Sequence, residues 1–143
     1  MANKSNKNSN QSFQKIPVPL ASLSAVLLPW YDREKRSLPW RDIVTPYRTW
    51  VSEIMLQQTR VQAVLPYFDR FMAAAPDVPA LAELAEDRLL SLWQGLGYYS
   101  RARSLQRSAR VMVDQYGGCL PDTYSDLIQL PGIGDYTAGA ILS

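Results

Sequence analysis

The stretch LIQLPGIGDYTAGAIL, residues 127–142, decides the fold, because it predicts a helix, a tight glycine turn and a second helix. Gly132 and Gly134 permit positive φ and let another group approach the backbone closely. The N-terminus of the helix that follows presents unpaired N–H groups and the positive end of the helix dipole. We expect such a turn to hold a phosphodiester without reading the bases.

Upstream of this stretch, apolar residues recur at helical spacing and no alternating strand pattern persists, so the predicted class is all-α. A connector is expected at 37–46, and Asp122 is expected to cap a short helix before the glycine turn. The helix that opens at Asp135 reaches Ser143 without a capping signal, which predicts a chain truncated within that helix. The other predicted helices cover 19–35, 46–58, 60–75, 79–95 and 99–116.

The composition excludes several kinds of chemistry. The 143 residues include one cysteine and no histidine, which rules out an internal disulfide, an all-cysteine metal site and histidine-based catalysis within the chain. Acid–base chemistry is left to carboxylates, tyrosine or lysine. No apolar run reaches the roughly 18–20 residues of a membrane span, and residues 1–17 are typical of a disordered polar tail, not of a signal peptide. We therefore expect a cytoplasmic protein without a membrane partner.

Positive charge is concentrated in one segment, although the net charge is only +2. Between Asp87 and Asp114 every charged residue is an arginine. A solvated helix face and a phosphate-facing surface both fit this pattern, and the nearby glycine turn favours the second. The arginines are Arg88, Arg101, Arg103, Arg107 and Arg110.

Glu53 is the candidate acid. In the predicted helix at 46–58 it falls between Leu56 and Trp50, so that large apolar side chains flank its carboxyl group. Burial without a basic partner raises the pKa of a glutamate, which is how a general acid arises at neutral pH. A glutamate paired with an arginine at a helix edge fits the pattern equally well.

Two further segments have the composition of DNA contacts. Residues 57–60, QQTR, lie at a predicted helix–helix junction, and amide, hydroxyl and guanidinium groups reach base edges and phosphates. Residues 95–99, GLGYY, form a glycine loop that could hold an aromatic side chain against a base stack. An ordinary surface corner and two tyrosines packed at a helix start are the alternatives.

Four segments in order resemble one family. They are LPWR (38–41), TPYRTWVSEIMLQQTRVQAVLPYFDRFM (45–72), LWQGLGYYSRARSL (92–105) and LPGIGDYTAGAILS (130–143). The last closely resembles a helix-hairpin-helix motif, and together they resemble the A/G-specific adenine DNA glycosylases of the MutY type. The resemblance covers about residues 19–143. It implies base-excision repair: removal of adenine mispaired with 8-oxoguanine or guanine, by hydrolysis of the N-glycosidic bond.

The resemblance also implies roles for single residues. Glu53 matches the family's catalytic acid, Tyr136 an active-site tyrosine near the sugar, and Arg41 a residue near the extruded adenine. Endonuclease III relatives have a lysine where Tyr136 stands, and because tyrosine forms no imine, strand-cleaving lyase chemistry is not expected. The family's group that recognises 8-oxoguanine is matched by Gln58, Thr59, Leu96 and Tyr98. Its phosphate-binding hairpin is matched by Gly132 and Gly134, and Arg60 is expected to contact DNA.

The resemblance finally implies parts that this sequence does not contain. The family's second carboxylate is an aspartate downstream of the hairpin, and full-length relatives hold a [4Fe-4S] cluster with four cysteines. Asp135 and Cys119 replace neither. We therefore expect no cofactor in this chain and no adenine excision by it alone; the alternative is a non-catalytic DNA-binding fragment. The expected protein is a monomer at the bacterial nucleoid, bound to double-stranded DNA with an adenine mismatch. Its expected parts are the tail (1–17), an N-terminal helix (18–36) and an incomplete six-helix-type domain (37–143) with the hairpin at 123–143.

Overall fold

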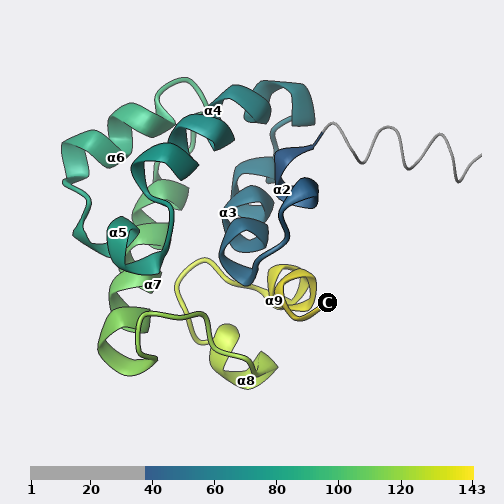
Figure 1. Ribbon diagram of the computed structural model, residues 1–143, viewed down its shortest axis with the longest axis vertical. Helices are drawn as coiled ribbons and strands as arrows, with labels where there is room; N and C mark the ends of the chain where they lie inside the picture. The colour runs from purple at the N-terminus through teal and green to yellow at the C-terminus, as the bar shows by residue number, and fades with distance from the viewer. Residues whose placement is uncertain (1–37) are drawn as a thin grey trace, which may run out of the picture. The chain divides into compact units, whose positions relative to one another are not determined.

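A computed structural model describes residues 38–143, and the regular secondary structure within this range is helical throughout, which confirms the all-α class. Residues 38–143 belong to one compact unit. The predicted polar tail and the predicted helix at 19–35 lie outside the described residues. In chain order the helices, labelled in Figure 1, are α2 (Pro39–Asp42), α3 (Pro46–Leu56), α4 (Val61–Ala74), α5 (Val78–Glu83), α6 (Glu86–Trp93), α7 (Ser100–Gln115), α8 (Tyr124–Leu127) and α9 (Asp135–Leu142).

Capping residues fix the ends of the two helices that matter most for the site. At the start of α3 the Thr45 Oγ1 accepts a hydrogen bond from the Arg48 N–H at 3.1 Å, and Pro46 occupies the first helical position. After α7 the backbone turns at Gly117, where φ is +65°, and the Gly118 N–H reaches the Met112 carbonyl at 2.9 Å. Both predicted boundaries are confirmed.

Three sequence predictions about elements were wrong in detail. The connector at 37–46 contains the short helix α2, and Thr123, not Asp122, caps α8 by accepting from the Asp126 N–H. The single helix predicted at 79–95 is two helices, α5 and α6. The Gln106 side-chain amide of α7 donates to the Leu81 and Leu84 carbonyls at 3.2 and 2.5 Å. These contacts satisfy carbonyls at the end of α5, so the helix stops without a glycine.

The core is built around α3. Trp50, Val51 and Met55 are fully buried, and α3 packs against α4, α7 and α9. On the α4 side the Trp40 ring meets Phe68 edge to face, with 5.2 Å between the ring centroids. Ser52 and Ile54, on either side of Glu53, are also buried. Packing thus holds the backbone that carries the glutamate side chain.

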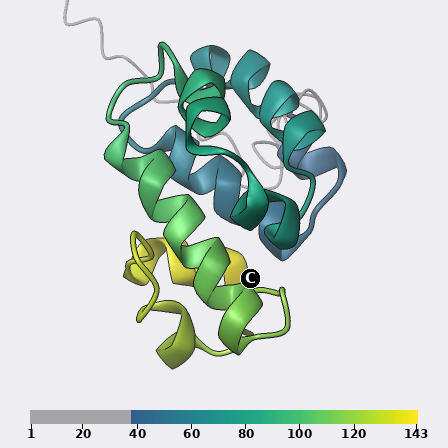
Figure 2. The same ribbon diagram turned by 90° about the vertical axis from the view of Figure 1, so that its left-hand side faces the viewer.

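Helix α7 connects the two ends of the described unit. Figure 2 shows it running from the helices α4–α6 down to the segment that carries α8 and α9. Where α7 passes the glycine turn, the Ser108 hydroxyl donates to the Pro131 carbonyl at 2.7 Å. The hairpin between α8 and α9 therefore rests directly on α7.

Candidate active site and nucleic-acid interface

Glu53 lies at the wall of a cavity of about 460 Å³ between α2, α3 and the C-terminal half of α9. The side chain is half-buried. Burial raises the pKa of its carboxyl group above the usual value, and the nearby Arg41 guanidinium opposes this with a smaller effect. Both features that the sequence left open, burial and a neighbouring arginine, are thus present at Glu53. Among the described residues that line the cavity, Glu53 is the one carboxylate.

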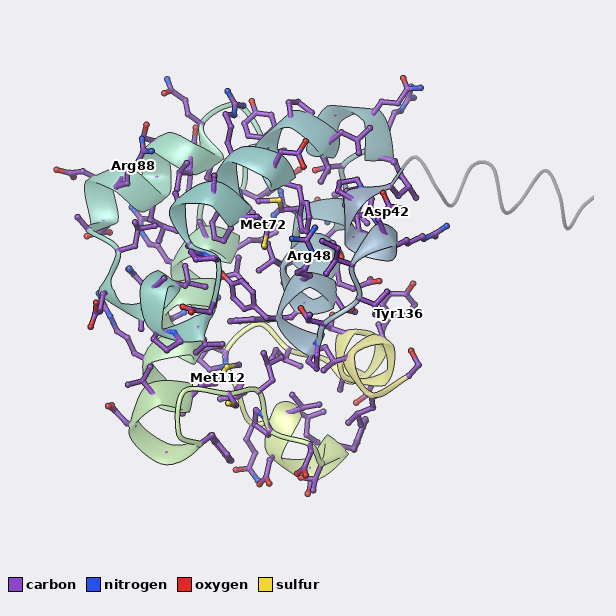
Figure 3. The ribbon with its side chains drawn as sticks, in the orientation of Figure 1. Asp42, Arg48, Met72, Arg88, Met112 and Tyr136 are labelled. Carbon is purple, nitrogen blue, oxygen red and sulfur yellow. The ribbon has the colours of Figure 1, made fainter. Side chains whose placement is uncertain are left out.

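Arg41 and Tyr136 are placed differently with respect to this cavity. Arg41 lines it, on the exposed surface of α2. Tyr136, in the first turn of α9, is 80% exposed and is not part of the cavity wall. Figure 3 shows Tyr136 on the same side of the molecule as Asp42 of α2, next to Arg41 in sequence. The tyrosine therefore stands outside the cavity, free to contact a bound molecule.

The glycine turn is present, but its two glycines differ. Gly132 has φ +78°, and a Cβ there would lie 3.2 Å from the Ser104 Cβ, so both the backbone and the packing require glycine. Gly134 does not use the positive φ that glycine permits, since its φ is −97°. No atom lies within 4 Å of a Cβ built at Gly134. Nothing in the described chain therefore demands glycine at that position.

The N-terminus of α9 is open to solvent beside this turn. Gly134 is the N-cap, and no side chain accepts a hydrogen bond from the first N–H groups of the helix. Beneath the turn, Leu130, Ile133 and Ile141 are buried and anchor the two helices. The Tyr124 hydroxyl donates to the Asp135 carboxylate, which ties α8 to the first turn of α9. The unpaired N–H groups and the positive end of the helix dipole favour an anion at this helix end, while the Asp135 carboxylate in the same turn opposes it.

Residues 57–60, here called the junction loop, connect α3 to α4. Gln58 is exposed and has φ +58°, a left-handed conformation that residues other than glycine rarely adopt. Thr59 is half-buried and its hydroxyl donates to the Gln57 carbonyl at 3.4 Å, while Arg60 is exposed at the start of α4. Gln58 and Arg60 are thus presented to solvent, as a contact to DNA requires.

Residues 95–99, here called the tyrosine loop, connect α6 to α7. Tyr98 is 64% exposed and has φ +50°. Leu96, which the sequence also placed among the DNA contacts, is only 8% exposed and belongs to the hydrophobic core. Its apolar side chain gains more from the core than from water, so Leu96 anchors the loop while Tyr98 projects from it.

The arginines of the acid-free segment, the residues between Asp87 and Asp114, do not all lie on one face of the molecule. Arg103, Arg107 and Arg110 are exposed on α7 at spacings of four and three residues, which places them on one face. Arg103 pairs with Glu86 at 3.2 Å, and Arg107 donates to Ser104, the residue beneath Gly132. Arg101 points elsewhere, into contact with α3. The sequence analysis did not separate Arg101 from the other arginines of α7. The signal was its position, which lies 100° or more around the helix from each of them.

The residues present do not fit a metal centre. Within residues 38–143 there is no group of three or more histidine, cysteine, aspartate or glutamate side chains placed to hold a metal ion. Cys119 is the only cysteine of the chain and is exposed, whereas a [4Fe-4S] cluster requires about four thiolates. The same range contains no helix with the length and apolarity to span a membrane.

The arrangement of the helices defines the class of the protein as a helical DNA-repair fold. A thermostable thymine-DNA glycosylase superimposes with a TM-score of 0.72 and 26% identity, over 85% of this chain and 57% of that one. An endonuclease III bound to DNA shares the fold, with a TM-score of 0.65 and 19% identity over 82% of this chain and 58% of that one. Residues 51–140 match the HhH-GPD superfamily of base excision DNA repair proteins, and the chain belongs to this family.

Curated relatives are named adenine DNA glycosylases. The chain is 46% identical to one from Buchnera aphidicola (subsp. Baizongia pistaciae) over 118 residues, 50% identical to one from Rattus norvegicus and 48% identical to one from Homo sapiens, each over 126 residues. These alignments cover 82% of this chain but 34%, 24% and 23% of the relatives. The resemblance inferred from the four motifs is confirmed, and the chain spans between a quarter and a third of the length of these relatives.

Proposed function

We propose that the protein carrying this chain is a monofunctional adenine DNA glycosylase that removes adenine mispaired with 8-oxoguanine or guanine. The observation that carries the proposal is the half-buried carboxyl group of Glu53, with its raised pKa, at the wall of a cavity whose volume of about 460 Å³ lies within the range of ligand pockets. Similarity to the adenine DNA glycosylases supplies the substrate. The enzyme acts as a monomer on chromosomal DNA at the bacterial nucleoid.

In this reaction Glu53 serves as general acid. Its protonated carboxyl group gives a proton to a ring nitrogen of the extruded adenine while the bond between the sugar C1′ and the base breaks. The bonding electrons stay with the base, which leaves neutral, and water adds to C1′ and loses a proton. Arg41 contacts the adenine in the cavity, and Tyr136 contacts the DNA just outside it.

The surrounding loops hold the DNA in position. The N–H groups at Gly132, at Gly134 and in the first turn of α9 bind a phosphate. Gln58 and Tyr98 insert beside the base opposite adenine, with Thr59 and Arg60 next to them, while Leu96 supports the tyrosine loop from the core. The open space at Gly134 supports this proposal, because a phosphate can approach the backbone there without meeting a side chain.

The test of the proposed function is Glu53→Gln in the protein at the length of its relatives. Duplex DNA with adenine opposite 8-oxoguanine is incubated with the enzyme, and alkali-labile sites are counted in single-turnover conditions. We expect excision to fall by about a hundredfold or more, the usual range for a lost general acid, with mismatch affinity retained. The matched control is Glu83→Gln, at an exposed glutamate of α5 remote from the cavity lining. Parental excision rates in Glu53→Gln would remove Glu53 from the mechanism.

For the 143-residue chain by itself we propose DNA binding without adenine excision. Hydrolysis of a glycosidic bond ordinarily uses two carboxylates, and Glu53 is the one acid among the described residues of the cavity wall. By contrast, α8, the glycine turn and α9 of the hairpin are all present among the described residues. This behaviour corresponds to a non-catalytic binding module, and the two activities are separated by measuring both on the same DNA.

A further inference from the structure

Arg101, in the first turn of α7, has a guanidinium group turned inward, unlike the exposed arginines of the same helix. Its Nη1 donates to the carbonyl oxygens of Gln57, Ile54 and Met55 at 2.6, 2.7 and 3.3 Å. Carbonyls at the end of an α-helix have no partner within the helix, so Arg101 closes the C-terminus of α3. Its Nη2 donates to the Gly97 carbonyl at 3.3 Å. One side chain thus contacts both the junction loop and the tyrosine loop.

The carbonyls that Arg101 holds precede the two unusual backbone positions of the site. Among the residues that the structure describes, Gln58 and Tyr98 are the only residues other than glycine with positive φ. Gln57 directly precedes Gln58, and Gly97 directly precedes Tyr98. A left-handed conformation is strained for such residues and persists only where the surroundings impose it. Arg101 grips the peptide before each of them.

Aromatic rings hold the guanidinium in this position. It lies 5.4 Å from the centroid of the Trp93 ring and 5.7 Å from that of Tyr98, and the Trp93 indole N–H donates to the same Gly97 carbonyl at 3.1 Å. Burial lowers the pKa of the Arg101 guanidinium, which still stays charged at neutral pH because arginine is not deprotonated in proteins. The charge is therefore held between the end of α3 and the tyrosine loop, with little room to move.

We propose that Arg101 is a positioning residue that fixes the junction loop and the tyrosine loop relative to each other, so that Gln58 and Tyr98 enter mismatched DNA as one unit. This inference rests on the proposed function and adds a specificity-determining residue to it. The planar fork of arginine donates in two directions at once, and the single ammonium group of lysine cannot reproduce this. Arg101→Lys therefore keeps the charge and loses the connection.

The first experiment compares Arg101→Lys with Gln106→Met in the 143-residue chain. Gln106 is the matched control, because it is buried on the same helix and also donates to carbonyls at the end of another helix, without contacting either loop. The measurement is the ratio of Kd values for a fully paired duplex and for one with adenine opposite 8-oxoguanine. We expect the ratio to fall about tenfold in Arg101→Lys, the equivalent of one lost charged hydrogen bond, and to stay near wild type in Gln106→Met.

A protein-only measurement separates this inference from the proposed function. In the wild-type chain, native-state hydrogen exchange followed by NMR reports the Thr59 N–H, the Leu96 N–H and the Trp93 indole N–H, which bond to Leu56, Trp93 and Gly97. If the two loops form one unit, these groups open with the same free energy and the same denaturant dependence. Independent opening overturns the proposal, and this measurement needs no variant to fold.

The outcomes are distinct. Common opening together with a wild-type chain that does not prefer the adenine mismatch contradicts the proposed function and leaves the connection of the loops intact. A mismatch preference that Arg101→Lys retains in full shows that only the charge of Arg101 matters, and overturns the positioning role. Equal loss of preference in Arg101→Lys and Gln106→Met, measured at equal margins below their melting temperatures, assigns Arg101 to general stability and overturns it too.

Discussion

At the scale of a single residue, Glu53 combines burial with a nearby positive charge. Desolvation by the surrounding apolar side chains raises the pKa of its carboxyl group, and the Arg41 guanidinium reduces this rise without cancelling it. Because the pKa of Glu53 differs between the folded and unfolded states, its ionisation affects the stability of the protein as well as the rate of proton transfer. The folded state holds the Glu53 proton more tightly than the unfolded chain does.

Stability should therefore decrease with pH at this residue. Below the usual carboxyl pKa, near pH 4, Glu53 is neutral in both states and costs nothing. As the pH rises through the raised pKa, the folded state must ionise a desolvated group, and the stabilisation is lost. We expect Glu53→Gln to melt at a higher temperature than wild type at pH 8, with the difference disappearing toward pH 4 in thermal melts. A constant difference at both pH values would contradict the assigned pKa shift.

At the scale of an element, the hairpin contains two glycines with different reasons to be glycine. Gly132 has a left-handed backbone and lies against Ser104 of α7, whereas Gly134 has an ordinary φ and open space around it. The first glycine therefore serves the fold of the chain. The second, on the proposed function, serves the approach of a DNA phosphate.

The two glycines give a matched pair of substitutions. Gly132→Ala should destabilise the chain by about 1–2 kcal/mol, because alanine is strained at positive φ and its Cβ would press on Ser104. Gly134→Ala should leave the melting temperature unchanged or slightly raised, since the backbone conformation suits alanine, yet weaken DNA binding. Melting curves and fluorescence-anisotropy titrations measure the two effects. Unchanged DNA affinity in Gly134→Ala would argue against a phosphate at that position.

At the scale of the whole molecule, two exposed arginines lie at different distances from the hairpin. Arg107 lies beside Ser104 and the glycine turn, whereas Arg88 of α6 lies far from α8 and α9 (Figure 3). Both side chains are exposed arginines of the same acid-free segment, so their replacement changes the net charge equally. Only one of them stands where DNA bound at the hairpin would pass.

Salt dependence should distinguish the two arginines. The 143-residue chain should shift duplex DNA in a gel and leave no alkali-labile sites, and its log Kd should rise linearly with log salt concentration as counterions are released. Arg107→Gln should reduce this slope by about 1, the contribution of one phosphate contact, while Arg88→Gln leaves it nearly unchanged. Alkali-labile sites made by the chain alone would disprove the proposed lack of excision. Equal slopes in Arg107→Gln and Arg88→Gln would contradict the proposal that DNA passes beside Arg107.

The sequence predicted the helices wherever the signal was local. Thr45-Pro46 and Gly117-Gly118 act on their own neighbours, so the start of α3 and the end of α7 could be predicted. The break between α5 and α6 was missed because Gln106, more than twenty residues later, satisfies the end of α5. The burial of Leu96 and the inward direction of Arg101 were missed for the same reason: each depends on a partner distant in sequence. The helical wheel placed Glu53 among apolar side chains. That burial changes the pKa of its carboxyl group more than Arg41 does depends on tertiary packing, which the wheel does not contain.

Two residues of α7 hold the loops described above: Arg101 donates to the junction and tyrosine loops, and Ser108 donates to Pro131 in the glycine turn. Arg101 and Ser108 are seven positions apart, which at 1.5 Å per residue is about 10 Å along the helix. On the proposed function, α7 therefore sets the spacing between the loops that enter the duplex and the turn that binds its phosphate. A single residue inserted between Arg101 and Ser108 would turn one side chain by about 100° around the helix relative to the other, so that the two could no longer hold their loops at once.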